Sequence, residues 1–192
     1  MMREYRHLVE ALTCADSQQS VRAREVLLET GRSAVPWLLN ALANSASDRD
    51  RWRMLTVLAE IGDPSVVPLM IKQLGAQSSA IRALAAQYLG SSGDRSAVEP
   101  MLHLLSNSDP NYSPIWVVDA LGKLGDKRAI DPLIAFLHRT QSPTERYTAI
   151  EALGRLGDPK AIEHIRPYAT DPDHHVRDRV ERALQQLTAI AG

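Results

Sequence analysis

The sequence predicts an all-α fold, a right-handed α-solenoid of five two-helix repeats with a half-repeat cap at each end. Three periodic observations predict it. Turn glycines recur at steps of 31, 31, 32 and 32 residues, at Gly31, Gly62, Gly93, Gly125 and Gly157. An apolar helix start follows each glycine, from Ala34-Val35 in the first copy to Ala161-Ile162 in the fifth. The segment 119–126, DALGKLGD, returns 32 residues later as EALGRLGD. Self-similarity at a fixed period of roughly 20–50 residues is typical of solenoids, whose repeats bury their apolar faces against each other.

The predicted elements follow in order along the chain. An N-terminal cap occupies residues 1–19, and its polar turn precedes a first helix that we expect to begin at Val21. The repeats are predicted at 20–43, 50–75, 79–106, 114–138 and 144–169, and a C-terminal cap helix at 174–189. The longest polar connection, 106–113, separates the third repeat from the fourth.

Within each repeat, the pattern predicts a first helix that ends at the turn glycine and a second helix that follows it. The second helix of repeat one carries one apolar stripe, Val35, Leu38, Leu39 and Leu42, at i, i+3, i+4 and i+7. This stripe degrades in the fifth copy, where Arg166 takes an apolar position. An aspartate follows four of the turn glycines and can accept hydrogen bonds from the free amides of the second helix: Asp63, Asp94, Asp126 and Asp158. Three further glycines in register near the ends of first helices, Gly90, Gly122 and Gly154, indicate close approach between layers.

The composition favours one domain without a strong electrostatic field. The chain has 192 residues, 44% of them hydrophobic, and 22 lysines and arginines against 23 aspartates and glutamates give a net charge of −1. This balance makes nucleic acid an unlikely partner. No apolar stretch is long enough to span a membrane, the start does not resemble a signal peptide, and a single cysteine excludes an internal disulfide. We therefore expect a cytoplasmic protein that is a monomer or a weak dimer.

The motif VRxxVxxALxxL at 176–187, with ALGxLGD turns, resembles the short HEAT-like repeats named after phycobilisome lyases, and the resemblance covers almost the whole chain. Tetratricopeptide and ankyrin repeats have similar periods, but their sequence signatures are missing. The family includes bilin lyase subunits, proteins of phycobilisome breakdown and general scaffolds. The resemblance implies that second helices line the concave face, and that lyase members present a groove to a phycobiliprotein and its open-chain tetrapyrrole.

Two columns of residues emerge when the repeats are aligned. On the second helices, apolar and aromatic side chains flank the core stripe, either as packing between repeats or as a strip for a protein partner: Trp37, Leu69, Leu104, Phe136, His164 and Tyr168. On the first helices, arginines recur at one position, as a structural ladder bonded to neighbouring turns or as an anion site: Arg51, Arg82, Arg146 and Arg177. The neutral charge balance favours the ladder.

No motif for catalysis, cofactor binding or metal binding stands out. The dense cluster 171–175, DPDHH, suits a capped helix start better than a metal site, because adjacent histidines point in different directions. HEAT-repeat iron hydroxylases carry His-Glu pairs, which this sequence lacks. Glycine-rich phosphate loops, serine elbows and paired cysteines are also missing, and Cys14 suits a buried or incidental thiol better than a nucleophile.

We therefore expect a non-catalytic protein-interaction scaffold, without metal or cofactor, that binds a partner on the second-helix face. A bilin lyase or chaperone subunit that acts on phycobiliproteins is the alternative.

Overall fold

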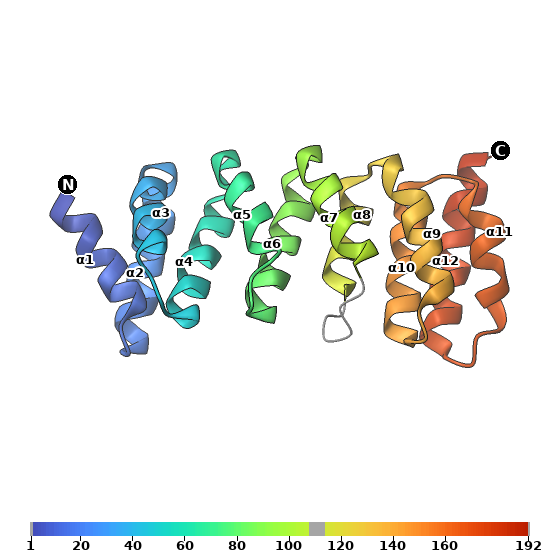
Figure 1. Cartoon of the computed structure of the whole chain (residues 1–192), viewed down its shortest axis with the longest axis horizontal. Coiled ribbons are helices and arrows are strands. Elements are labelled where there is room, and N and C mark those ends of the chain that lie inside the picture. The colour runs from blue at the N-terminus through green and yellow to red at the C-terminus, as the bar shows by residue number, and fades with distance from the viewer. Residues whose placement is uncertain (1, 108–113, 192) are drawn as a thin grey trace. The chain divides into compact units, whose positions relative to one another are not determined.

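The computed structural model describes residues 2–107 and 114–191, and the described residues contain helices and no strand (Figure 1). The chain forms two compact units, Met1–Ala85 and Ala86–Gly192, and the boundary falls within one helix. In each unit, helices of successive repeats pack against one another, as the solenoid prediction requires. Within the described ranges, none of the helices combines the length and the apolar character needed to cross a bilayer.

Unit 1 contains the N-terminal cap, repeat one, repeat two and the start of the third repeat. Its helices are α1 (Met2–Thr13), α2 (Ser17–Thr30), η1 (Gly31–Ala34), α3 (Val35–Ala43), α4 (Asp48–Ile61), η2 (Pro64–Val66), α5 (Val67–Gln73) and α6 (Ser79–Ser92), which crosses the boundary. The η elements are single 3₁₀ turns. The core includes Leu12, Leu27, Leu38, Leu58 and Met70, all almost completely buried.

Unit 2 contains the remaining repeats and the C-terminal cap. Its helices are η3 (Arg95–Ala97), α7 (Val98–Ser106), α8 (Ile115–Leu124), η4 (Lys127–Ala129), α9 (Ile130–Arg139), α10 (Pro143–Leu156), α11 (Ala161–Ile165), η5 (Arg166–Thr170) and α12 (His174–Ala191). Residues 108–113 of the polar connection between repeats three and four lie outside the described residues. Helix α10 packs between α8 and α12, so first helices of successive repeats lie side by side (Figure 1).

One predicted boundary is wrong, and one second helix is interrupted, for identifiable reasons. Helix α2 begins at Ser17 instead of Val21, because the Asp16 carboxylate accepts from Gln18 N at 2.8 Å and Gln19 N at 3.3 Å and caps a wholly polar first turn. The fifth second helix ends at Ile165 and continues as the 3₁₀ turns of η5, which contain Pro167. A proline here removes an amide donor from the helix interior, so the degraded apolar stripe coincides with a real break.

The turns between paired helices follow the predicted chemistry. All five turn glycines have positive φ angles, between 61° and 72°, which glycine adopts without steric cost. Each of the four turn aspartates accepts a hydrogen bond from the amide two residues later, as Asp126 does from Arg128 N at 3.0 Å. The second helix therefore opens as a capped 3₁₀ turn in repeats two, three and four.

Glycines also set the spacing between layers in unit 2. A Cβ atom built on Gly122 would lie 2.7 Å from Cα of Ala152 on the next first helix. The same geometry pairs Gly90 with Ala120, and Gly154 approaches Ala183. Real Cβ contacts are almost never as short as those at Gly90 and Gly122, so these two positions require glycine, and the predicted close approach of the layers is confirmed.

Candidate functional site

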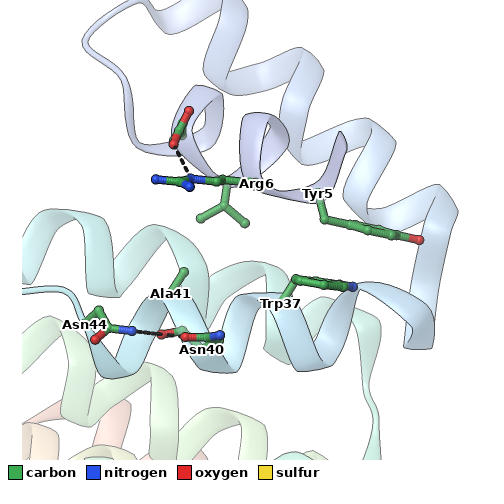
Figure 2. A pocket seen from close by; sticks show the side chains of 8 residues that line it. Tyr5, Arg6, Trp37, Asn40, Ala41 and Asn44 are labelled. Atoms are coloured by element: carbon green, nitrogen blue, oxygen red, sulfur yellow. Dashed lines mark hydrogen bonds and ion pairs between the residues drawn. The ribbon is translucent and has the colours of Figure 1, made fainter. Parts of the chain in front are cut away.

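A groove lies between α1 and α3 in unit 1 (Figure 2). It has a cavity volume of about 520 Å³ and combines aromatic, aliphatic, amide and charged side chains. The lining residues are Tyr5, Arg6, Val9, Glu10, Trp37, Asn40, Ala41 and Asn44. Trp37 is thus the one member of the predicted second-helix column that lines this groove.

The two aromatic rings of the groove stack on each other. The centroids of Tyr5 and Trp37 lie 5.5 Å apart with an interplanar angle of 5°, and both side chains remain partly exposed (Figure 2). Such an offset aromatic pair presents apolar edges together with the Tyr5 hydroxyl and the Trp37 N–H group. The pair can therefore contact an apolar side chain and donate hydrogen bonds.

Polar residues border the aromatic pair. Asn44 donates to the Asn40 carbonyl at 2.8 Å and to the Asn40 side-chain oxygen at 3.0 Å, which orients both amides on the surface of α3 (Figure 2). On α1, Arg6 donates to Glu10 at 3.1 Å, and both side chains are exposed. The groove therefore carries no net charge from this pair, in keeping with the neutral composition.

The C-terminal end of α1 is bonded to neighbouring helices. Arg53 of α4 donates to the carbonyls of Leu12 and Cys14 at 3.1 and 2.8 Å, and Ser20 donates to the Leu12 carbonyl at 2.8 Å. Buried Val9 and Leu12 anchor the same helix in the core. Arg53 and Ser20 therefore bind carbonyls at the end of α1 and tie this helix to α4 and α2.

The side chain of Phe136 is buried and does not belong to the candidate contact surface. Its side chain is only 3% exposed, and the Arg139 guanidinium lies over its ring, 5.3 Å from the centroid. Arg139 also donates to the Leu105 carbonyl, which fixes this cover in place. Leu104 and Tyr168, at the equivalent position of neighbouring repeats, are half-buried. The predicted column is therefore packed at Phe136 and partly accessible on either side of it.

The other predicted contact residues lie in separate surroundings. Leu69 is half-buried on α5 in unit 1 and does not line the groove. His164 and Tyr168 lie together in unit 2, where they meet a second histidine. His138 Nε2 is 3.2 Å from His164 Nδ1, and the Tyr168 hydroxyl is 3.4 Å from His138 Nδ1 and 3.1 Å from the Leu137 carbonyl. Burial raises the pKa of Tyr168 above its ordinary value, which keeps the phenol neutral.

The arginines of the first-helix column contact the loops that precede their helices. Arg82 donates to the carbonyls of Ala76 and Gln77 at 2.7 and 2.8 Å, and Arg177 donates to those of Asp171 and Pro172 at 2.7 and 3.0 Å. Arg51 reaches the Ser45 carbonyl at 3.5 Å and the buried Gln73 amide oxygen at 3.3 Å.

Arg146, the fourth member, pairs with the Asp171 carboxylate at 3.1 Å, and both side chains are largely buried. All four guanidinium groups are therefore engaged within the protein. Such engagement leaves few of their donors for an external anion.

The remaining sequence candidates have structural contacts. Asp173 accepts from His175 N at 2.8 Å and Val176 N at 3.3 Å, so the 171–175 cluster forms a capped helix start. Cys14 is half-buried, and its thiol lies 3.4 Å from the Asp16 carbonyl. Among the described residues, no group of three or more His, Cys, Asp or Glu side chains is arranged to hold a metal ion.

The sequence did not predict two contacts, the one between Tyr5 and Trp37 and the one between His138 and His164. Tyr5 meets Trp37 only because α1 packs beside α3, and no repeat of the sequence marks that pairing. His138 and His164 are 26 residues apart, which is not the repeat period, so alignment of the repeats places them at different positions.

Comparisons with known proteins agree with the architecture. The family model for HEAT repeats matches residues 35–113 and 100–185. The complex of CpcE and CpcF of phycocyanin lyase from Nostoc sp. PCC7120 is similar, with a TM-score of 0.65 and 24% identity over 98% of this chain and 77% of that chain. The crystal structure of an engineered protein is similar with a TM-score of 0.61 and 21% identity over 97% of both chains. A designed armadillo repeat protein matches with a TM-score of 0.52 and 16% identity over 94% of this chain and 98% of that chain. At these identities the solved structures share the fold alone. No curated protein matches the sequence.

Proposed function

The chain belongs to the HEAT repeat family, and we propose that it is a non-catalytic scaffold whose second helices bind a protein partner. The observation that carries this proposal is the groove between α1 and α3, where Trp37 and Tyr5 are partly exposed on a fixed helical frame. Partly exposed aromatic residues in a concave, preformed surface are the usual anchors of protein interfaces. In unit 2, half-buried Leu104 and Tyr168 offer a separate set of contacts on second helices.

The chemistry of the groove fits a peptide segment with one apolar side chain. That side chain would pack against the Tyr5–Trp37 pair. The exposed amides of Asn40 and Asn44 offer donors and acceptors that match those of a peptide backbone. Because Arg6 and Glu10 neutralise each other, the groove has no charge that selects a strongly acidic or basic segment.

The test is capture of the partner with matched tryptophan variants. Trp37→Ala removes the groove anchor, whereas Trp52→Ala removes a 43% exposed tryptophan from α4, a first helix of the same unit. Proteins retained from the native host lysate by the wild-type chain are identified, and the affinity of each is then measured with purified components. Loss of a central aromatic anchor costs about 2 kcal/mol or more, which raises Kd roughly thirtyfold. We expect this increase for Trp37→Ala and unchanged binding for Trp52→Ala. Equal affinity of the two variants for every captured protein would show that the groove is not part of the interface.

A second candidate function is that of a bilin lyase or chaperone subunit that acts on phycobiliproteins. The motif resemblance and the structural similarity to the phycocyanin lyase complex along 98% of this chain support it. This function requires contact with an open-chain tetrapyrrole or with an apo-phycobiliprotein.

Visible absorbance separates the two functions. A bilin subunit shifts or sharpens the absorbance of an added bilin, or speeds its attachment to an apo-phycobiliprotein when a second lyase subunit is present. A scaffold with another client leaves both the spectrum and the attachment rate unchanged. The Trp37→Ala and Trp52→Ala variants serve as the matched pair in this assay as well.

A further inference from the structure

We propose that His138 and His164 form a two-histidine site for a divalent transition-metal ion, with Zn²⁺ as the representative. The site lies within unit 2, between the second helices α9 and α11, and does not depend on the proposed scaffold function. His138 is exposed and His164 is half-buried, so an ion can reach both rings from solvent.

The distance between the two ring nitrogens matches metal ligation. His138 Nε2 and His164 Nδ1 lie 3.2 Å apart. With Zn–N bonds of about 2.0–2.1 Å and tetrahedral geometry, two ligating nitrogens lie about 3.3 Å from each other. The rings cross at 70°, so they are not stacked face to face. An ion can therefore bind both nitrogens after small side-chain rotations.

The hydrogen bonds of Tyr168 select the tautomer of His138 that a metal needs. The Leu137 carbonyl can only accept, so the contact of 3.1 Å uses the Tyr168 hydroxyl proton. The contact of 3.4 Å between the Tyr168 oxygen and His138 Nδ1 then requires the proton on Nδ1. The lone pair of His138 consequently lies on Nε2, the nitrogen that faces His164. A ring N–H bonded to a second protein group is the usual arrangement behind a histidine ligand.

His164 has an acidic partner on its other side. Its Nε2 atom lies 3.8 Å from the Glu163 carboxylate. Without metal, His164 Nδ1 donates its proton to His138 Nε2 across the 3.2 Å gap. Metal binding requires the lone pair on His164 Nδ1, and the proton moves through solvent to Nε2, where Glu163 favours it. The imidazole remains neutral, as a metal ligand must.

Two protein ligands leave the remaining positions of the ion to water. The described residues offer no third His, Cys, Asp or Glu for this cluster. Imidazole ligands suit zinc, copper and nickel better than calcium or magnesium, which prefer oxygen. The site should therefore bind Zn²⁺ reversibly and exchange it with chelators.

Calorimetric titration of the untagged chain with Zn²⁺, after chelator treatment, tests the site. We expect saturation at one ion per chain at these histidines, and selective shifts of the His138 and His164 imidazole signals by nitrogen NMR. His138→Ala and His164→Ala should each weaken binding by at least about tenfold, since loss of a group behind a ligand already costs this much. His103→Ala is the matched control, because His103 is an exposed second-helix histidine beside the Asn107 amide, at 3.2 Å.

A Tyr168→Phe variant tests the orienting hydrogen bond. It keeps the ring, and we expect about tenfold weaker Zn²⁺ binding with the stoichiometry unchanged. Far-UV circular dichroism checks that each variant folds. The proposal is overturned when the wild-type chain takes up no Zn²⁺, or when the double variant His138→Ala, His164→Ala binds it as the wild type does.

Discussion

Among the turn aspartates, Asp126 has the most strongly lowered pKa. Its carboxylate accepts from the backbone amide of Arg128 at 3.0 Å and from the guanidinium of the same residue at 3.0 and 2.9 Å. These hydrogen bonds, with a smaller contribution from Arg95, lower the pKa of Asp126 from 3.8 to about 2. A lowered pKa in the folded state means that the charged carboxylate stabilises the fold.

Acid should weaken this contribution in a defined window. The Asp126 contribution is fully present above pH 3.8 and is lost as the pH falls through about 2. Urea denaturation of the wild type and of Asp126→Asn should therefore show a stability difference near neutral pH that shrinks as the pH falls through this window. Asp94→Asn is the matched control, because Ser96 alone provides the hydrogen bonds that lower the pKa of Asp94. A difference between wild type and Asp126→Asn that stays constant with pH would contradict this account.

Phe136 should contribute to the stability of the fold and not to the binding of a partner. Phe136→Ala removes a side chain that is 3% exposed, and such core truncations cost about 3–5 kcal/mol. Leu104→Ala, at the same position of the preceding repeat, removes a half-buried side chain and should cost less. Urea denaturation of the two variants measures the contrast, and equal losses would argue against the packed environment of Phe136.

At the scale of the helix, the contact between first helices of successive repeats in unit 2 depends on glycines, which carry no Cβ atom. Gly122→Ala places a Cβ atom 2.7 Å from the Ala152 backbone, so α8 and α10 must separate. Overpacking of this kind costs about 1–3 kcal/mol and should lower the melting temperature measured by circular dichroism. Gly75→Ala is the control, since its Cβ meets the Lys72 carbonyl at an ordinary 3.8 Å and its φ angle is not positive. A melting temperature lowered equally in both variants would contradict the layer contact as the cause, because loss of unfolded-chain flexibility alone raises stability.

The boundaries of helices could be predicted where they are set by residues that recur in each repeat, and not elsewhere. The turn glycines and aspartates recur at fixed steps, so the ends of first helices and the starts of second helices followed from the sequence. The start of α2 did not, because Ser17 to Ser20 are polar and apolar periodicity cannot detect a polar first turn. The burial of Phe136 was also beyond a helical wheel, since Arg139 of the same helix reaches across its ring toward the Leu105 carbonyl.

The candidate site was predictable only in part, because it joins residues that the repeat does not relate. Trp37 was identified from its column, whereas Tyr5 belongs to the cap and becomes relevant through the packing of α1 on α3. His164 and Tyr168 were identified from the second-helix surface, but His138 was not, because the sequence cannot show which histidines of neighbouring repeats meet. Contacts between repeats depend on side-chain directions that spacing alone does not determine.

At the scale of the whole molecule, the charge balance predicts that the protein does not bind duplex DNA. Lysines and arginines number 22 against 23 aspartates and glutamates, and the predicted arginine column is engaged with loop carbonyls, Gln73 and Asp171. We expect no retention of duplex DNA in a mobility-shift assay at low salt. A shift that disappears as salt rises would reveal a phosphate contact surface and contradict this prediction.

The glycine–alanine contacts in unit 2 also bear on how such a chain can change length. Gly90 meets Ala120 and Gly122 meets Ala152 in the same geometry, so one layer offers the next layer the same interlocking surface. Duplication or deletion of one 32-residue copy, cut at equivalent residues, would join surfaces that already fit. An insertion of one or two residues within a first helix would instead place a side chain where the backbone of the neighbouring helix must pass. Lineages that carry this fold can therefore gain or lose exposed surface in whole copies, while the packing that holds the copies together stays the same.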